Sequence, residues 1–295
     1  MDALDSLPID LSFDAAIVAS GAASAPFGAF TAMRKTPPRF PGVELSGHFL
    51  KHADEQTILA LEAIRRAVEQ ANLDTSLHSD WGVIAAPRFI GRLNGGYILH
   101  RFAKGGGAAV PPHAVAQNSL HSMSGAASVA LGIHGPNLGV GGGAWAIADG
   151  FAAALTLFNG SSVPGMWLLM TEWSPEPIPD AGGEPLNETT CYAVAMAIVP
   201  RQRASHETSG EAKKLHSLKA NASTVRLRVP VKRPVAVRTG RGHASAPPPE
   251  PSLAQLAASL DEARFGIPSR WSFQLPWGAS VDLQLAALPS QRAAA

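Results

Sequence analysis

The stretch that decides the fold is residues 118–160, NSLHSMSGAASVALGIHGPNLGVGGGAWAIADGFAAALTLFNG. Residues 114–133 are predicted to be helical, and their Gly and Ala content lets another backbone come close, in a core or at a subunit interface. A brief strand is predicted over 138–141. A glycine turn then leads into a predicted apolar helix over 144–158, which Asn-Gly ends. The order is therefore small-residue helix, short strand, glycine turn and buried helix.

Residues 138–158 carry one charge, Asp149, so a membrane-spanning helix has to be weighed. Four of the first six residues are glycine, and no basic residue closely flanks the run. Membrane spans have basic flanks and a continuous apolar stretch. We therefore expect a buried helix and no membrane span.

Strands and helices alternate through the first 200 residues. A helix is predicted from its cap at Asp54 to about Asn72, with Leu59, Ile64 and Val68 along one side. Pro, Gly and Phe in 21–52 predict an irregular surface excursion. The remaining predicted strands are 13–20, 81–86, 165–172 and 189–199. This alternation predicts an α/β fold with a mixed sheet covered by helices.

The character of the chain changes after Pro200. Residues 225–238, VRLRVPVKRPVAVR, predict an edge strand or paired short strands. A Pro-rich linker over 240–252, a helix over 253–264 and a closing hairpin follow. We therefore divide the chain into a domain at 1–200, a basic strand segment with linker at 201–252, and a helix and hairpin at 253–295 that pack on the domain.

Composition excludes several classes of protein. Hydrophobic residues make up 46% of the 295 and charged residues 16%, which is too apolar for wholesale disorder. One cysteine excludes an intrachain disulfide framework and a thiolate metal cluster. The acidic first residues lack the basic region of a secretory signal. We expect a reducing, cytoplasmic location.

Charge is distributed unevenly. Residues 1–200 hold 10 basic and 17 acidic residues, whereas 201–243 hold 11 and 2. This basic block indicates an acidic partner. It has no interleaved aromatic residues and no known module, so we expect no nucleic-acid binding.

Residues 111–160 resemble the nucleophile region of the β-ketoacyl synthases of the thiolase superfamily. Gly135-Pro136-Asn137 matches the turn of that family, and LGVGGG matches the strand and the residues before the catalytic cysteine. Ala144 stands at the cysteine position. Alanine keeps the helix start but removes the nucleophile.

The resemblance covers residues 13–199 and implies a thiolase-like half-fold. The family's second half carries two catalytic histidines, and the segments here that hold His206, His216 and His243 do not match it. The resemblance of a short chain to this half of the family implies a non-catalytic synthase subunit, similar to a chain length factor. Such a subunit would act in fatty-acid, polyketide or aryl-polyene-type lipid biosynthesis.

The resemblance also implies partners. The strand before the nucleophile position pairs across a dimer interface in the family, so 122–133 and 138–141 are expected to contact a second copy or a full synthase. An acidic acyl carrier protein is the expected partner of the basic block, at Arg226, Arg228, Lys232 and Arg233. A vestigial acyl pocket is expected at Gly141, Gly142, Gly143 and Trp145.

A dinucleotide-binding or coenzyme A-binding enzyme is the alternative. The run from Gly139 to Ala144 fits G-x-G-x-x-A after a strand and before a helix, and Glu172 ends the next strand, where a ribose-binding acid is expected. A Rossmann unit, however, begins with a longer central strand than LGV and leaves the Gly135-Pro136 turn unexplained.

The other candidates for chemistry have simpler explanations. Cys191 lies in an apolar strand and is predicted to be a core residue. Ser122 and Ser124 lie in SMSGA, which is not the G-x-S-x-G elbow of hydrolases. His48 and His52 are four apart beside acidic residues, but the glycine and prolines before them predict a loop. We expect no metal and no cofactor.

Overall fold

The computed structural model describes residues 9–43, 45–46, 48–160, 162–201, 223–231 and 252–286. These residues form one eight-stranded mixed sheet in the order β3-β2-β4-β5-β1-β6-β8-β7. Strands β2, β3 and β4 are parallel, and every other pairing is antiparallel. The strands are β1 Ile9–Pro26, β2 Gly82–Arg88, β3 Asn137–Gly139, β4 Met166–Ser174, β5 Thr190–Pro200, β6 Ser223–Val231, β7 Ser269–Gln274 and β8 Ser280–Leu285.

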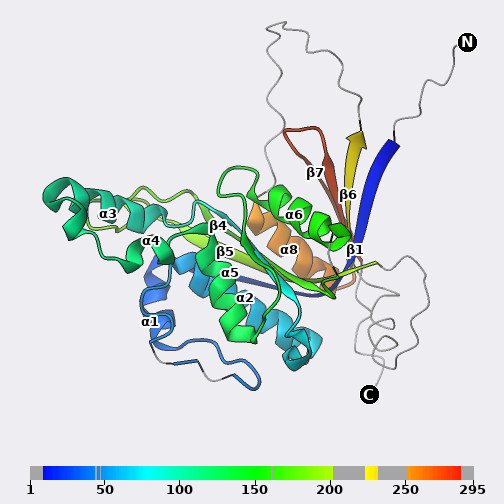
Figure 1. Cartoon of the computed structure of the whole chain (residues 1–295), viewed down its shortest axis with the longest axis horizontal. Coiled ribbons are helices and arrows are strands. Elements are labelled where there is room, and N and C mark those ends of the chain that lie inside the picture. The colour runs from blue at the N-terminus through cyan, green and yellow to red at the C-terminus, as the bar shows by residue number, and fades with distance from the viewer. Residues whose placement is uncertain are drawn as a thin grey trace, which may run out of the picture.

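Helices cover both faces of the sheet (Figure 1). On one face lie α1 (Phe30–Lys35), α2 (Glu55–Ala71) and α5 (Leu120–Leu131), and on the other lie α6 (Ala146–Gly160) and α8 (Leu253–Arg264). Two further helices, α3 (Arg92–Gly105) and α4 (His113–Gln117), lie beyond the end of the strands at the left of Figure 1. Short 3-10 turns occupy Phe27–Ala29, Thr75–His78 and Gly107–Ala109. The α/β fold with a mixed, helix-covered sheet is confirmed.

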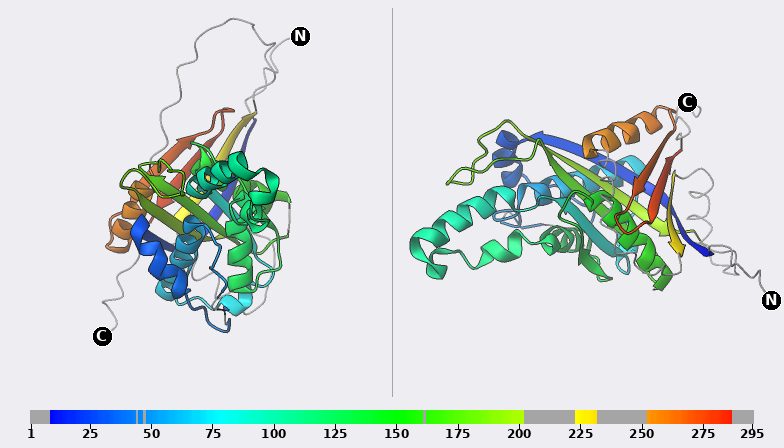
Figure 2. Two further views of the ribbon diagram at one scale, coloured as in Figure 1. Left: turned by 90° about the vertical axis from the view of Figure 1, so that its left-hand side faces the viewer. Right: turned by 90° about the horizontal axis from the view of Figure 1, so that it is seen from above.

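The long strand β1 joins two parts of the sheet. Its residues 15–26 pair with β5, and its residues 9–17 pair with β6, with a register shift between Ile17 and Ala19. Figure 2 shows β1 running along the sheet from beside α1 to the end that holds β6, β8 and β7. The segments after residue 222 therefore extend the sheet of the first 200 residues.

Helix α6 explains why the sheet extends in this way. The helix contacts β2 and β4 as well as β6 and β8, which are far apart in the strand order, so the sheet wraps around it. Phe151 and Leu155 are buried inside this wrap, together with Phe273 and Val281 of the closing hairpin. A helix that is apolar on most sides needs such cover. Among the described residues, no helix is long and apolar enough to cross a membrane.

Local signals placed several elements correctly. Helix α2 begins after Asp54, whose side chain accepts a hydrogen bond from the Gln56 amide, and ends at Asn72 in the left-handed region, φ 48°. Helix α8 has the predicted bounds, and its cap Ser252 forms a capping box with Gln255. The hairpin of β7 and β8 is confirmed.

Three expectations were wrong. Residues 21–35 are not irregular, because β1 continues to Pro26 and helical turns follow it. Residues 114–133 are divided between α4 and α5, because Asn118 and Ser119 separate them. Strand β6 is not an edge strand, because it lies between β1 and β8. The last part of the 225–238 segment lies outside the described residues.

Candidate functional site

The turn between β3 and α6 depends on glycine. A Cβ atom on Gly139 would lie 2.2 Å from the Leu120 carbonyl oxygen, so only glycine fits against α5. Gly141 and Gly142 have φ values of 80° and 97°, which L side chains rarely adopt. The turn is held to β2, where Val140 N donates to Ala85 O at 2.8 Å. The sequence LGVGGG therefore brings the chain from the sheet edge to the start of α6.

Ala144 is exposed and lies two residues before α6, which begins slightly later than the predicted residue 144. The first helical hydrogen bond runs from Asp149 N to Trp145 O at 2.9 Å. The free amides of a helix N-terminus carry partial positive charge and stabilise a nearby anion. Residue 144 therefore lies beside a helix N-terminus, and its side chain is a methyl group.

The predicted acyl-pocket residues lie together in this turn. Gly141 and Gly143 are exposed, whereas Gly142 and Trp145 are half-buried. None of the four lines the cavity found elsewhere in the described structure. Their role in an acyl pocket stays a prediction.

A buried polar network lies near the turn, at the carboxyl ends of β2 and β4. Glu172 is 4% exposed and forms an ion pair with Arg88, at 3.4 Å from Nη1 to Oε2. The same carboxylate accepts a hydrogen bond from the Leu253 amide at 3.1 Å, at the start of α8. The side chain of Gln56 donates to Arg88 O at 3.0 Å and accepts from the Thr171 hydroxyl at 2.6 Å. The sequence analysis missed this network.

The network bears on the dinucleotide alternative. Glu172, the expected ribose-binding acid, is buried and engaged with Arg88 and α8. The strand before the glycine turn, β3, is three residues long and lies at the edge of the sheet. Neither feature favours a Rossmann-type site, whose first strand is central and whose acid faces the ligand.

The other nucleophile candidates are structural. Cys191 is buried on the face of the sheet opposite α6, and burial raises the pKa of its thiol well above the usual value. The prediction of a core cysteine is confirmed. Ser124 is fully buried, and its hydroxyl donates to the His121 carbonyl at 3.1 Å. Ser122 donates to Ser119 O at 2.8 Å. Burial therefore keeps Cys191 and Ser124 out of contact with a substrate.

Arg226 and Arg228 project from β6 on the side away from α6, and each is paired with a carboxylate on a neighbouring strand. Arg226 binds Asp14 through two hydrogen bonds of 2.6 and 2.9 Å, which raise the pKa of the guanidinium. Arg228 lies 3.0 Å from Asp282. The side chains of Arg226 and Arg228 are 45% and 55% exposed to solvent. The other two predicted contact residues, Lys232 and Arg233, lie outside the described residues.

The predicted subunit contact lies at one edge of the sheet. Strand β3 pairs only with β2 within the described structure, so its other side presents unpaired backbone groups. Leu138 is 40% exposed, and Val129 on the adjacent α5 is 59% exposed. Apolar side chains therefore flank an open strand edge.

The histidines were also checked as metal ligands. No cluster of three or more His, Cys, Asp or Glu side chains with the arrangement of a metal site occurs among the described residues. The ring of His52 instead contacts the tilted ring of His113 in α4, with ring centroids 4.2 Å apart. His206, His216 and His243 lie in segments that the structure does not describe.

Comparisons with known proteins found matches in structure and not in sequence. No family model and no curated protein matches the chain. A structure described as the ishigamide ketosynthase/chain length factor is 12% identical, with a TM-score of 0.51, over 94% of this chain and 100% of that chain.

Two other structures are similar at lower scores. A type II polyketide ketosynthase in complex with its acyl carrier protein is 12% identical, with a TM-score of 0.45, over 65% of this chain. This chain spans 64% of the length of that ketosynthase structure. A ketosynthase with its chain length factor from Xenorhabdus doucetiae is 17% identical, with a TM-score of 0.43, over 73% of this chain and 94% of that chain. The ketosynthase-like resemblance seen in residues 111–160 is thus confirmed at the level of fold: the chain has the thiolase-like α/β fold of ketosynthases and chain length factors.

Proposed function

We propose that the chain is a non-catalytic, ketosynthase-like subunit that works beside a partner synthase in fatty-acid, polyketide or aryl-polyene-type lipid biosynthesis. The observation that carries this proposal is Ala144. It occupies the exposed end of the glycine turn before α6, at the position that the resemblance of residues 111–160 assigns to the ketosynthase nucleophile.

The physical reason is the chemistry of a thioester exchange. A thiolate at a helix N-terminus is stabilised by the helix amides and attacks an acyl thioester. Ala144 has no lone pair to attack with. The chain's one thiol, Cys191, is buried on the opposite face of the sheet. Chain condensation therefore has to be carried out by a partner.

The open edge at β3 supports association with that partner. An exposed strand edge flanked by Leu138 and Val129 suits strand pairing with a second subunit. One fold neighbour is named as a ketosynthase/chain length factor, a pairing that fits this proposal. We propose a homodimer or a heterodimer with a full synthase.

The β6 surface is the proposed contact for an acyl carrier protein. An approaching carboxylate would have to replace Asp14 beside Arg226 or Asp282 beside Arg228. Each such exchange gains little, because exposed ion pairs contribute about 0–1 kcal/mol. Binding is therefore expected to be weak, fast and reduced by salt.

The experiment has two parts. A tagged chain is purified from its native cell, and a copurifying ketosynthase is the expected result. Binding to an acyl carrier protein is then measured across NaCl concentrations for the wild type and for Arg226→Gln/Arg228→Gln. Lys35→Gln/Arg39→Gln, which removes the same charge elsewhere on the surface, is the matched control.

The β6 pair is expected to weaken carrier binding and flatten its salt dependence, whereas the control pair leaves both unchanged. Equal effects of the two double substitutions would mean that Arg226 and Arg228 contribute to carrier binding only as general surface charge. A strictly monomeric chain with no copurifying synthase, even at high concentration, would contradict the subunit proposal.

A further inference from the structure

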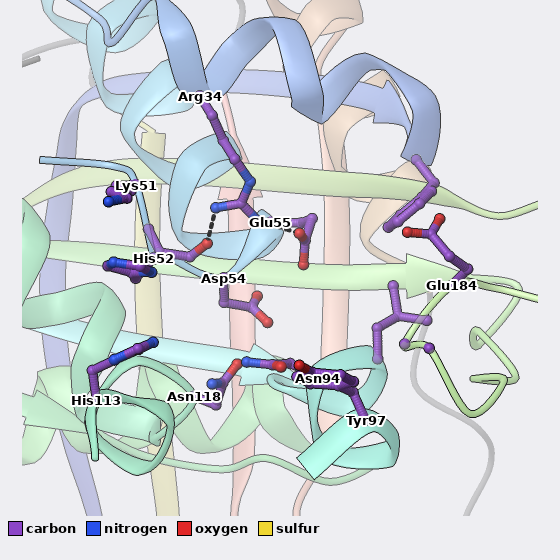
Figure 3. Close-up of a pocket in the computed structure, with 15 residues that line it drawn as sticks. Arg34, Lys51, His52, Asp54, Glu55, Asn94, Tyr97, His113, Asn118 and Glu184 are labelled. Carbon is purple, nitrogen blue, oxygen red and sulfur yellow. Dashed lines mark hydrogen bonds and ion pairs between the residues drawn. The ribbon is translucent and has the colours of Figure 1, made fainter. Parts of the chain in front are cut away.

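A cavity of about 270 Å³ lies beside the N-terminus of α2, away from the glycine turn. Four helices contribute to it, α1, α2, α3 and α4, together with the loop between β4 and β5. Figure 3 shows Lys51, His52 and His113 along one side of this cavity and Glu184 on the other, with Asp54 between them. The charged groups of the two sides are thus separated.

The side formed by Lys51, His52 and His113 is called here the basic wall. The imidazole rings of His52 and His113 are in contact, with centroids 4.2 Å apart and an interplanar angle of 35°. Partial desolvation and the positive charges of His113, Lys51 and Arg34 lower the pKa of His52. The charged groups that act on His52 are all basic, so an anion placed there would relieve their mutual repulsion.

The loop that carries the basic wall is held in place. Arg34 of α1 donates to the carbonyls of Leu50, at 3.2 Å, and Ala53, and it pairs with the Glu55 carboxylate. Its positive charge is therefore already paired with Glu55, and its hydrogen bonds hold the loop in position. Lys51 and His52 lie in the sequence between the two residues whose carbonyls Arg34 binds, and both side chains remain exposed at the cavity.

Asp54 fixes the floor of the cavity. Its two carboxyl oxygens accept from Gln56 N at 2.8 Å and from Gly91 N at 3.1 Å, which ties α2 to the segment before α3. Burial, the largest cause, raises the pKa of this carboxyl to about 7. The floor is thus preformed, and a carboxyl there is protonated far more readily than an exposed one.

Asn118 supplies an unused acceptor. Its side-chain nitrogen donates to the Ala114 carbonyl at 2.6 Å, which fixes the orientation of the amide. Its Oδ1 atom is buried and has no hydrogen-bond partner within the described part of the chain. A buried acceptor without a donor is unfavourable, and because neighbouring atoms cover this Oδ1 atom, a ligand hydroxyl would reach it after a small side-chain movement and would then be favoured there.

We propose that this cavity binds a small hydroxylated anion, with its carboxylate or phosphate group on the basic wall and its hydroxyl donating to Asn118 Oδ1. Glu184 would repel the charged end from the other side, which orients the ligand. The volume is below the roughly 300–1,000 Å³ of sites for drug-sized ligands, so the ligand is small. This site is separate from the proposed subunit function and does not depend on it.

Histidine proton resonances of the full chain provide the test. Four probes are titrated: glycerol 3-phosphate, malate, inorganic phosphate and glycerol. The two hydroxylated anions are expected to shift the His52 and His113 resonances saturably and to raise the pKa of His52. Their dissociation constants should be at least about tenfold below that of glycerol, which lacks the charge, since one charge-assisted hydrogen bond contributes about 1.5–3 kcal/mol. The ratio of the dissociation constants of glycerol 3-phosphate and malate shows whether the cavity prefers a phosphate or a carboxylate group.

Variants separate binding from structure. Lys51→Gln and His113→Gln are expected to weaken glycerol 3-phosphate binding about tenfold or more, whereas the matched controls Lys104→Gln and His134→Gln, outside the cavity, leave it unchanged. Asn118→Ala should remove the preference for glycerol 3-phosphate over inorganic phosphate. Resonance dispersion outside the cavity confirms that each variant is folded.

Binding should also be tighter at about pH 6 than at about pH 8, because the carboxyl of Asp54, whose pKa burial raises to about 7, loses its negative charge as the pH falls through this range and then no longer repels an anion. The charged and titratable side chains that line the cavity, including those of the basic wall, are Arg34, Lys51, His52, Asp54, Glu55, Tyr97, His113 and Glu184. The absence of a saturable shift with any probe would overturn the proposal. So would equal losses in the cavity and control variants, or equal affinity for glycerol and for the two hydroxylated anions.

Discussion

A cysteine introduced at position 144 should become a reactive thiol. Position 144 is exposed and adjoins the N-terminus of α6, whereas the native Cys191 is buried with a raised thiol pKa. A helix N-terminus stabilises a nearby anion by about 0.3–1 kcal/mol. At 1.36 kcal/mol per pKa unit, this lowers a thiol pKa of about 8.5 by roughly 0.2–0.7 unit. The thiolate fraction near neutral pH then rises about two- to fivefold.

The assay is the rate of alkylation by iodoacetamide, followed by intact-protein mass. Ala144→Cys is compared with Ala258→Cys, an exposed position in the middle of α8. The first is expected to react about two- to fivefold faster, and the wild type should stay unmodified while folded. Equal rates for the two variants would refute the placement of residue 144 at a helix N-terminus. Rapid alkylation of the wild type would contradict the burial of Cys191.

Three other predictions follow from the described contacts. Glu172→Gln should lower the free energy of unfolding by roughly 2–4 kcal/mol, because it breaks a buried ion pair and weakens the cap of α8. Calorimetry should show a melting temperature roughly 4–12 °C lower. The control is Glu262→Gln, at an exposed position. Burial lowers the pKa of His78 to about 4, so the unfolded chain binds more protons; stability should fall as pH drops from about 6.5 to about 4, and denaturant titrations of a folded His78→Gln variant should lose this dependence. Leu138→Lys on β3 should weaken self-association or synthase binding in sedimentation experiments, whereas Leu186→Lys, at an exposed leucine in the loop between β4 and β5, should not.

Much of the local structure could be predicted from the sequence because its signals lie within a few residues. Asp54 before an apolar-periodic segment gave the start of α2, and the Gly139–Ala144 run gave the turn between a short strand and a helix. The likeness of residues 111–160 to ketosynthases gave the fold, because that segment holds the constrained strand-turn-helix.

The extent of the sheet could not be predicted, because it depends on pairings between distant segments. β1 spans 18 residues since its two ends pair with different strands, and a Ser-Gly pair at 20–21 does not interrupt it. Alternation of Val and Arg in β6 is the same for an edge strand and for a strand with one exposed face. The pairing with β8, nearly 60 residues later, decides between them.

The buried network and the cavity were missed for the same reason. Gln56 and Arg88 look like ordinary surface residues in the sequence, and Glu172 was considered only as a ribose-binding acid. Only the sheet brings the three together. The cavity collects side chains from five separate segments. The ion pair of Arg226 with Asp14 joins residues 212 positions apart, so the basic block looked uncompensated in the sequence.

The proposed non-catalytic role means that the chain forms no covalent acyl-enzyme, and intact-protein mass spectrometry can detect such an adduct. The purified wild-type chain is incubated with malonyl and medium-chain acyl carrier proteins, and its mass is measured before and after hydroxylamine treatment. The account predicts no added mass, because Ala144 offers no nucleophile and Cys191 is buried. An acyl adduct on the wild-type chain that hydroxylamine removes would contradict it.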